Sequence, residues 1–126
     1  MQIEVSNGEI IDKITILQLK EKFITDPVKL NNVKTEIEEL SSLRDEIITT
    51  PFLSTLYSLL YEVNSKLWVI EDKLRDKERN KEFDEEFIEL ARSVYFTNDE
   101  RAKIKKDINT ASGSKLIEEK SYQEYQ

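Results

Sequence analysis

The longest run of regularly spaced apolar residues lies between residues 51 and 79. Its leucine, isoleucine and valine side chains follow one another in uninterrupted steps of three and four, which places them along one side of a helix. This stretch therefore predicts a long helix that buries one stripe against its neighbours. The positions of this leucine stripe are Leu53, Leu56, Leu60, Val63, Leu67, Ile70 and Leu74.

Three other stretches have helical periodicity and residues that begin or end helices. Serine, aspartate or threonine precedes the first three predicted helices and can accept a hydrogen bond from the first turn, and two of these helices have proline at their first position. Gly113 supplies a stop for the last helix. The four helices are predicted over residues 8–24, 27–48, 51–79 and 84–111, with Ser6 (completed by Glu9 as a capping box), Asp26 and Thr50 as caps of the first three.

The connections between these helices are short, so consecutive helices should lie antiparallel. The sequence thus predicts an all-α fold, a single helical domain over residues 1–126 built as an antiparallel up-down bundle of four long helices. The run TNDE at 97–100 leaves open whether the fourth helix is bent or split, because Thr97 and Glu100 form a second possible capping box.

Both ends of the chain lie outside the helical pattern. The N-terminal run MQIEV alternates weakly and predicts a short strand or an extended arm. The C-terminal tail, residues 112–126, is expected to be extended, with Tyr122 or Tyr125 available to dock it on the bundle.

The first predicted helix has apolar residues on two sides. Such a helix is either central in its own fold or buried in an oligomer. The second alternative predicts a homo-oligomer or another protein partner that binds through residues 8–24. One face carries Ile10, Ile14, Leu17 and Ile24, and the opposite face carries Ile16, Leu19 and Phe23.

Composition and charge narrow the function classes. The net charge is −7, so a basic surface for nucleic acid or for an anionic membrane is not expected. No apolar run approaches the roughly 20 residues that span a bilayer, and the N-terminus lacks the basic and apolar regions of a secretory signal. We therefore expect a cytoplasmic protein that binds neither nucleic acid nor membrane.

The chain contains no cysteine and no histidine. Disulfides, thiolate catalysis, imidazole acid–base catalysis and metal sites built from these residues are therefore excluded. Any remaining chemistry must use carboxylates, lysine, arginine, tyrosine or an ion held by oxygen ligands.

A strip of polar residues follows one flank of the leucine stripe. In the run NSKLWVIEDKLR, the residues Asn64, Trp68, Glu71 and Arg75 recur every three or four positions, whereas Asp72 points further toward solvent. Such a strip on a flank that faces the core needs polar partners on another helix.

The predicted fourth helix offers those partners between residues 92 and 105. If the third and fourth helices are antiparallel, the carboxylates of Glu71 and Asp72 should meet the guanidinium of Arg92 or Arg101, because arginine binds a carboxylate with two parallel hydrogen bonds. The candidate site residues are Asn64, Trp68, Glu71, Asp72, Arg75, Arg92, Tyr95, Asn98, Asp99, Arg101 and Lys105.

Two interpretations of this cluster remain open. In the first, it is a buried network that fixes the register of the helices, with the single tryptophan packed between them. In the second, it lines a cleft for a small anion, sugar phosphate or nucleotide. Arg92, Arg101 and Lys105 would then hold the anion. Glu71 or Asp72 would act as a base or bind an ion.

These interpretations lead to two hypotheses about function. The leading one is a non-enzymatic helical binding or assembly module, without a catalytic residue. The alternative is a small enzyme or ligand-binding protein that acts on a phosphorylated or sugar-nucleotide ligand through the same carboxylates and arginines. A sealed, fully paired cluster favours a structural network, whereas an open cleft with arginine donors on its wall favours a ligand.

Two pairs of glutamates have a spacing that could hold Mg²⁺ on facing helices, Glu36 with Glu39 and Glu86 with Glu89. In a chain this acidic, such pairs arise by chance on solvated faces. Neither a cofactor nor a metal site is therefore predicted.

Four blocks of the sequence together resemble a family of short all-helical proteins of unknown function. They are SNGEIIDKITIL, NSKLWVIEDKLR, FIELARSVYFTNDERAKIKKDIN and GSKLIEEKSY, in this order over nearly the whole chain, and residues 28–58 depart most from the family. The family is met in tailed bacteriophages of marine bacteria and in bacterial gene neighbourhoods for surface-polysaccharide synthesis. The resemblance implies an all-helical fold and a bacterial or phage setting, and it implies no particular activity, cofactor or catalytic residue.

Overall fold

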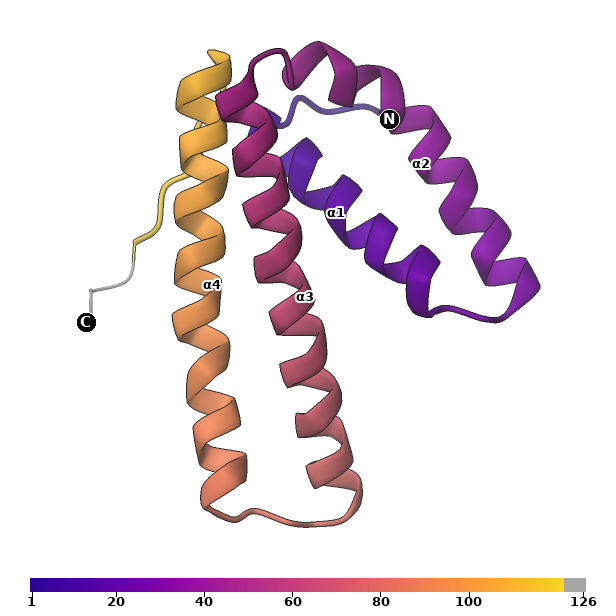
Figure 1. Ribbon diagram of the computed structural model, residues 1–126, viewed down its shortest axis with the longest axis vertical. Coiled ribbons are helices and arrows are strands. Elements are labelled where there is room, and N and C mark those ends of the chain that lie inside the picture. The colour runs from indigo at the N-terminus through magenta and orange to yellow at the C-terminus, as the bar shows by residue number, and fades with distance from the viewer. Residues whose placement is uncertain (122–126) are drawn as a thin grey trace.

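The computed structural model describes residues 1–121, and every regular element among them is a helix (Figure 1). The predicted all-α helical bundle is confirmed. No helix in this part of the chain is long and apolar enough to cross a membrane. The helices are α1 (Asn7–Phe23), α2 (Pro27–Ile47), α3 (Pro51–Arg79) and α4 (Glu85–Ser112), and each bound differs from the predicted one by at most one residue.

Side chains cap the N-termini of all four helices, and the caps of the first three are the predicted residues. Each N-cap oxygen accepts a hydrogen bond from a backbone N–H in the first turn, and Gly113 ends α4 in the left-handed conformation with φ of 68°. The capping box predicted for Glu9 does not form, because its carboxylate bonds to Lys105 instead. The cap hydrogen bonds join Ser6 to Glu9, Asp26 to Lys29, Thr50 to Leu53 and Asp84 to Phe87.

The fourth helix runs through Thr97 without a break. Thr97 is 8% exposed and lies within α4, so it does not cap a new helix. At the chain ends, residues 1–6 form an arm without regular structure. The predicted docking of the tail by Tyr122 or Tyr125 lies outside the described residues.

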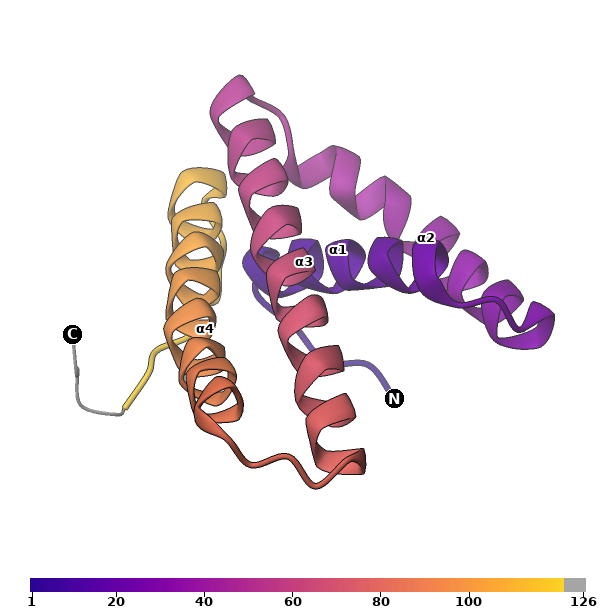
Figure 2. The same ribbon diagram turned by 60° about the horizontal axis from the view of Figure 1, so that its bottom comes forward.

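The four helices form two hairpins that diverge from each other (Figures 1 and 2). The α3 and α4 helices lie side by side along their length, and α1 crosses them near the start of α3 and the end of α4. The α2 helix packs on α1, away from α4. Consequently α1 contacts all three other helices, whereas the far end of the α3–α4 hairpin extends beyond it.

The central position of α1 uses both of its apolar faces within the chain. On the second face, Leu19 is 1% exposed, whereas Phe23 is 47% exposed and its ring stacks on Trp68 with centroids 5.3 Å apart. The first of the two alternatives for this helix therefore applies. Association with a partner through α1 stays a prediction.

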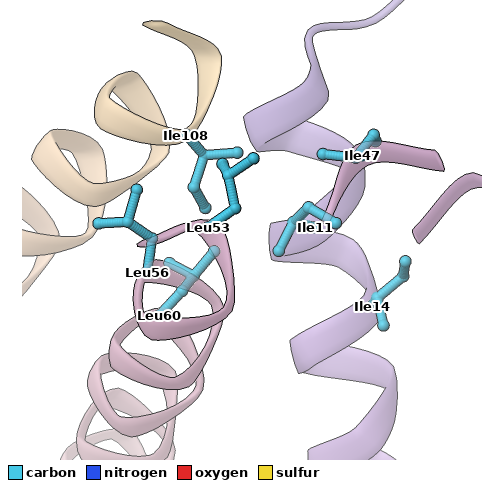
Figure 3. Packing of buried hydrophobic residues seen from close by; sticks show 7 residues of the cluster. All are labelled: Ile11, Ile14, Ile47, Leu53, Leu56, Leu60 and Ile108. Atoms are coloured by element: carbon cyan, nitrogen blue, oxygen red, sulfur yellow. The ribbon is translucent and has the colours of Figure 1, made fainter. Parts of the chain in front are cut away.

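The buried hydrophobic cluster of the core lies where α1 crosses the start of α3 and the end of α4 (Figure 3). Aliphatic side chains from all four helices meet there, each less than a tenth exposed, and their burial is the main stabilising contribution of the crossing. The cluster consists of Ile11, Ile14, Ile47, Leu53, Leu56, Leu60 and Ile108.

The crossing also depends on close approach between two backbones. Gly8 in the first turn of α1 packs against α4, and a Cβ atom at this position would overlap the carbonyl oxygen of Lys105 and lie 3.0 Å from Oδ1 of Asn109. The N–H of Gly8 donates a 2.6 Å hydrogen bond to that same Oδ1 atom. Only glycine fits here without moving the helices apart.

Burial of the leucine stripe changes along α3. The positions from Leu53 to Leu67 are at most 6% exposed, because α1 and α4 both cover them. Ile70 and Leu74 are only half-buried, since they lie beyond Trp68, on which Phe23 at the end of α1 stacks. The leucine stripe therefore faces the neighbouring helices along its whole length, but its last two positions are buried less deeply than the first five.

Candidate functional site

A buried carboxylate forms the centre of the polar network. Asp12 belongs to α1, and its side chain is 2% exposed at the point where α1, α3 and α4 meet. Removing a carboxylate from water costs several kcal/mol unless charged and polar partners replace the water. The geometry around Asp12 supplies such partners on two other helices.

Arg101 of α4 binds Asp12 with two hydrogen bonds. Its Nε donates to Oδ1 at 2.8 Å, and its Nη2 donates to Oδ2 at 2.5 Å. The hydrogen bonds that Arg101 donates to the Asp12 carboxylate raise the pKa of Arg101 above its ordinary value, so the guanidinium stays charged. The guanidinium side chain remains 28% exposed, so it is only partly enclosed.

Asn64 of α3 completes the network. Its Nδ2 donates to Oδ1 of Asp12 at 2.9 Å and to the hydroxyl of Thr15 at 2.8 Å. The Thr15 hydroxyl in turn donates to the backbone carbonyl of Asp12 at 2.7 Å. Within residues 1–121, every buried side-chain nitrogen or oxygen has a hydrogen-bond partner, so this part of the cluster is a satisfied structural network.

The predicted pairs between α3 carboxylates and α4 arginines do not form. Glu71 is half exposed and lies 4.0 Å from Arg75 of the same helix, while Asp72 is exposed. Arg101 pairs with Asp12 instead, and Arg92 is exposed with its guanidinium 5.9 Å from the ring of Phe96. The reason is the position of α1. Its Asp12 carboxylate contacts both α3 and α4 and takes the place beside Arg101 that the sequence analysis assigned to Glu71.

The polar strip on α3 is the continuation of the flank that faces α1. Asn64 lies under α1 and is 4% exposed, and Trp68 contacts the end of α1 by stacking on Phe23. Glu71 and Arg75 follow on the same flank, one and two turns beyond Trp68, and both are exposed. Their charges are therefore solvated.

A cleft opens where α1 and the α3–α4 hairpin diverge. Its volume is about 430 Å³, which suits a small molecule. It has an apolar wall from Ile16, Leu19, Leu67 and Trp68. Seven of the eleven candidate residues line it, namely Asn64, Trp68, Glu71, Asp72, Arg75, Asn98 and Arg101, together with Lys20. We call it the α1–α3–α4 cleft.

The remaining candidates lie elsewhere on α4. A neighbouring hollow of about 540 Å³ is lined by Tyr95, Asp99 and Lys105, and it shares Asn98 and Arg101 with the α1–α3–α4 cleft. Lys105 donates a 2.7 Å hydrogen bond to Glu9 of α1. Arg92 lines neither space.

Sequence reasoning missed the α1 side of the site, which is Asp12 and Thr15. The sequence does contain an indication that Asp12 is buried. Asp12 lies one turn from Gly8 and from Thr15 on a helix that is apolar on both sides. A carboxylate surrounded by buried positions must find a cationic partner on another helix. The predicted site residues all belong to the third and fourth helices, so Asp12 and Thr15 of the first helix are not among them.

A family model described as a family of unknown function, DUF6165, matches residues 1–125. The chain belongs to DUF6165. The match covers both the α1–α3–α4 cleft and the buried network beneath it. A search of the curated proteins and a search of the solved structures each found no match. Because DUF6165 is a family of unknown function, membership assigns no activity to this chain.

Proposed function

We propose that this DUF6165 protein is a non-enzymatic binding module whose α1–α3–α4 cleft holds a small polyhydroxylated ligand with an anionic group, such as a phosphorylated sugar or a sugar nucleotide. One observation carries the proposal. The buried carboxylate of Asp12 holds the guanidinium of Arg101 at the wall of an amphipathic cleft. A guanidinium oriented in this way is a ready-made contact for an anion.

The lining of the cleft supports this ligand class. Lys20, Arg75 and Arg101 are cationic and suit a phosphate, and Glu71 and Asp72 can accept hydrogen bonds from hydroxyl groups. The apolar wall that includes Trp68 suits the apolar face of a sugar ring or a base. Both signs of charge together disfavour a simple anion and favour a ligand with donors and acceptors.

Two features favour binding over catalysis. Glu71 and Asp72 are exposed to solvent, whereas a catalytic acid or base usually works in a site that excludes water. Asp12 is buried, but both of its oxygens are already bonded to Arg101. The family resemblance noted from the sequence supports a setting in the cytoplasm of a bacterial or phage-infected cell.

The experiment is a thermal-shift and calorimetric titration of the full chain. The probes are glucose 6-phosphate and UDP-glucose, with glucose and inorganic phosphate as controls. A ligand that binds the folded state must raise the melting temperature. Glu71→Gln and Arg75→Gln change exposed side chains outside the core. Each should weaken binding about tenfold through the loss of a charge-assisted hydrogen bond.

The matched control is Glu62→Gln, which changes the same charge on α3 outside the cleft. It should leave the affinity unchanged. If neither phosphorylated probe raises the melting temperature, or if the Glu62 variant weakens binding as much as the Glu71 variant, the proposal is wrong.

A further inference from the structure

Positive charge is concentrated in one segment of this acidic chain. Residues 101–120 contain six basic and three acidic residues, for a net charge of +3, although the whole chain has a net charge of −7. This segment comprises the end of α4 and the described part of the tail that lies beside it (Figure 1). A local field of opposite sign to the whole molecule selects for anions at that place.

A hollow lies between α4 and this tail. It has a volume of about 270 Å³ and shares no lining residue with the α1–α3–α4 cleft. Four lysines border it against two glutamates. The lining residues are Ala102, Lys103, Lys105, Lys106, Asn109, Glu118, Glu119 and Lys120, and we call this space the lysine hollow.

The two glutamates of the tail already bind two of the lysines. Both carboxylate oxygens of Glu119 accept hydrogen bonds from Lys106, at 3.1 and 3.0 Å. Glu118 lies 3.6 Å from Lys105. Lys103 and Lys120 form no ion pair with any residue from 1 to 121, so the hollow keeps two cationic groups that no carboxylate of the described chain neutralises.

The tail contacts are weak enough to be exchanged. Lys106 and Glu119 have side chains that are 52% and 71% exposed, and exposed pairs of this kind contribute little and are screened by salt. Lys105 is also held by Glu9, so it stays in place when a tail carboxylate leaves. The tail therefore occupies the lysine hollow with two carboxylates that a stronger anion can displace.

We propose that the lysine hollow is a binding site for a diphosphate group, and that Glu118 and Glu119 occupy it in the absence of that ligand. A diphosphate carries more charge than two carboxylates and has terminal oxygens at both ends, so one molecule can contact several lysine ammonium groups at once. The volume is sufficient for a diphosphate and too small for a folded partner. This site goes beyond the α1–α3–α4 cleft and does not depend on it.

The experiment measures binding of inorganic pyrophosphate to the full chain by calorimetry, at low ionic strength and at about 150 mM salt. Saturable binding that weakens with salt is expected. Glu118→Gln combined with Glu119→Gln should tighten binding about fivefold, because the competing carboxylates are removed. Lys103→Gln combined with Lys120→Gln should weaken it about tenfold, since neither lysine has a partner within residues 1–121 to lose.

The matched control is Lys29→Gln combined with Lys34→Gln, which removes two exposed lysines from α2. The affinity should stay within about twofold of the wild type, because these charges lie outside the hollow. The proposal is overturned if pyrophosphate does not bind, if the tail variant binds no more tightly than the wild type, or if both lysine variants weaken binding equally. Tighter binding of a single-stranded oligonucleotide than of pyrophosphate, increasing with its length, would also overturn it in favour of a nucleic-acid surface.

Discussion

The two halves of α3, each packed on α4, have the same heptad spacing and different surroundings. In the covered half, residues 51–67 of α3 with 97–112 of α4, a third helix crosses the pair. In the bare half, residues 69–79 with 85–96, which lie beyond the contact of Trp68 with Phe23 of α1, the two helices pack mainly on each other (Figure 1). Periodicity therefore identifies which residues face inward, and the number of covering helices decides how far they are buried.

The polar residues follow the same division. Asn64 lies in the covered half and is 4% exposed within a satisfied network. Glu71 lies in the bare half on the same flank and is half exposed. A similar pattern in sequence therefore has two physical meanings, a buried network under α1 and solvated charges beyond it.

The largest effect is expected for the apolar positions. Leu60→Ala removes a side chain that is 0% exposed and should destabilise the protein by about 3–4 kcal/mol, because the close-packed crossing cannot collapse around the cavity. Leu74→Ala, at the equivalent position of the bare half, should cost about 1 kcal/mol, since water already reaches this site. Urea unfolding monitored by circular dichroism measures both, and equal losses would contradict the division into two halves.

The next largest effect concerns the buried charge. Asp12→Ala should destabilise by about 3 kcal/mol, because Arg101 and Asn64 lose their partner inside the crossing. Glu71→Ala should change the free energy of unfolding by less than about 0.5 kcal/mol, as for other exposed ion pairs. The same unfolding assay applies. A larger loss of stability for Glu71→Ala than for Asp12→Ala would instead support the predicted ion pair between Glu71 of α3 and an arginine of α4.

A third prediction tests the contact that places α1 on α4. Gly8→Ala should destabilise by about 2 kcal/mol, since the new methyl group overlaps the Lys105 carbonyl and the backbones must separate. Gly113→Ala is the control, because no atom lies within 4 Å of a Cβ there and only the left-handed backbone opposes it, at about 1 kcal/mol. Hydrogen exchange should show that Gly8→Ala loosens α1 while the bare half stays unchanged.

The smallest effect is a dependence on pH. The hydrogen bond from Lys105 lowers the pKa of Glu9 below its ordinary value of 4.5. The folded state therefore binds this proton less readily than the unfolded state, so the contribution to stability is present above pH 4.5 and is lost as the pH falls below it. Glu9→Gln should flatten the decline of stability between about pH 5 and pH 3. Glu62→Gln, on the exposed surface of α3, should leave that decline unchanged.

Some features of this protein are local and could be read from the sequence alone. The four helices, their caps at Ser6, Asp26 and Thr50, and the stop at Gly113 depend on residues within one turn of each other. The absence of histidine and cysteine is likewise a property of the chain itself. The α3 side of the α1–α3–α4 cleft is also predictable from the sequence, because Trp68, Glu71 and Arg75 lie on one flank of the same helix.

Only the tertiary structure decided which groups pair. Asp12 and Arg101 are separated by 89 residues, and nothing in the spacing along either helix states that α1 crosses α4 at this place. The crossing is set by long-range packing, in which Gly8 lets two backbones approach and the aliphatic cluster fills the space beside them. Burial and charge pairing both follow from that one crossing, because a third helix removes water from one half of the hairpin and leaves the other half solvated.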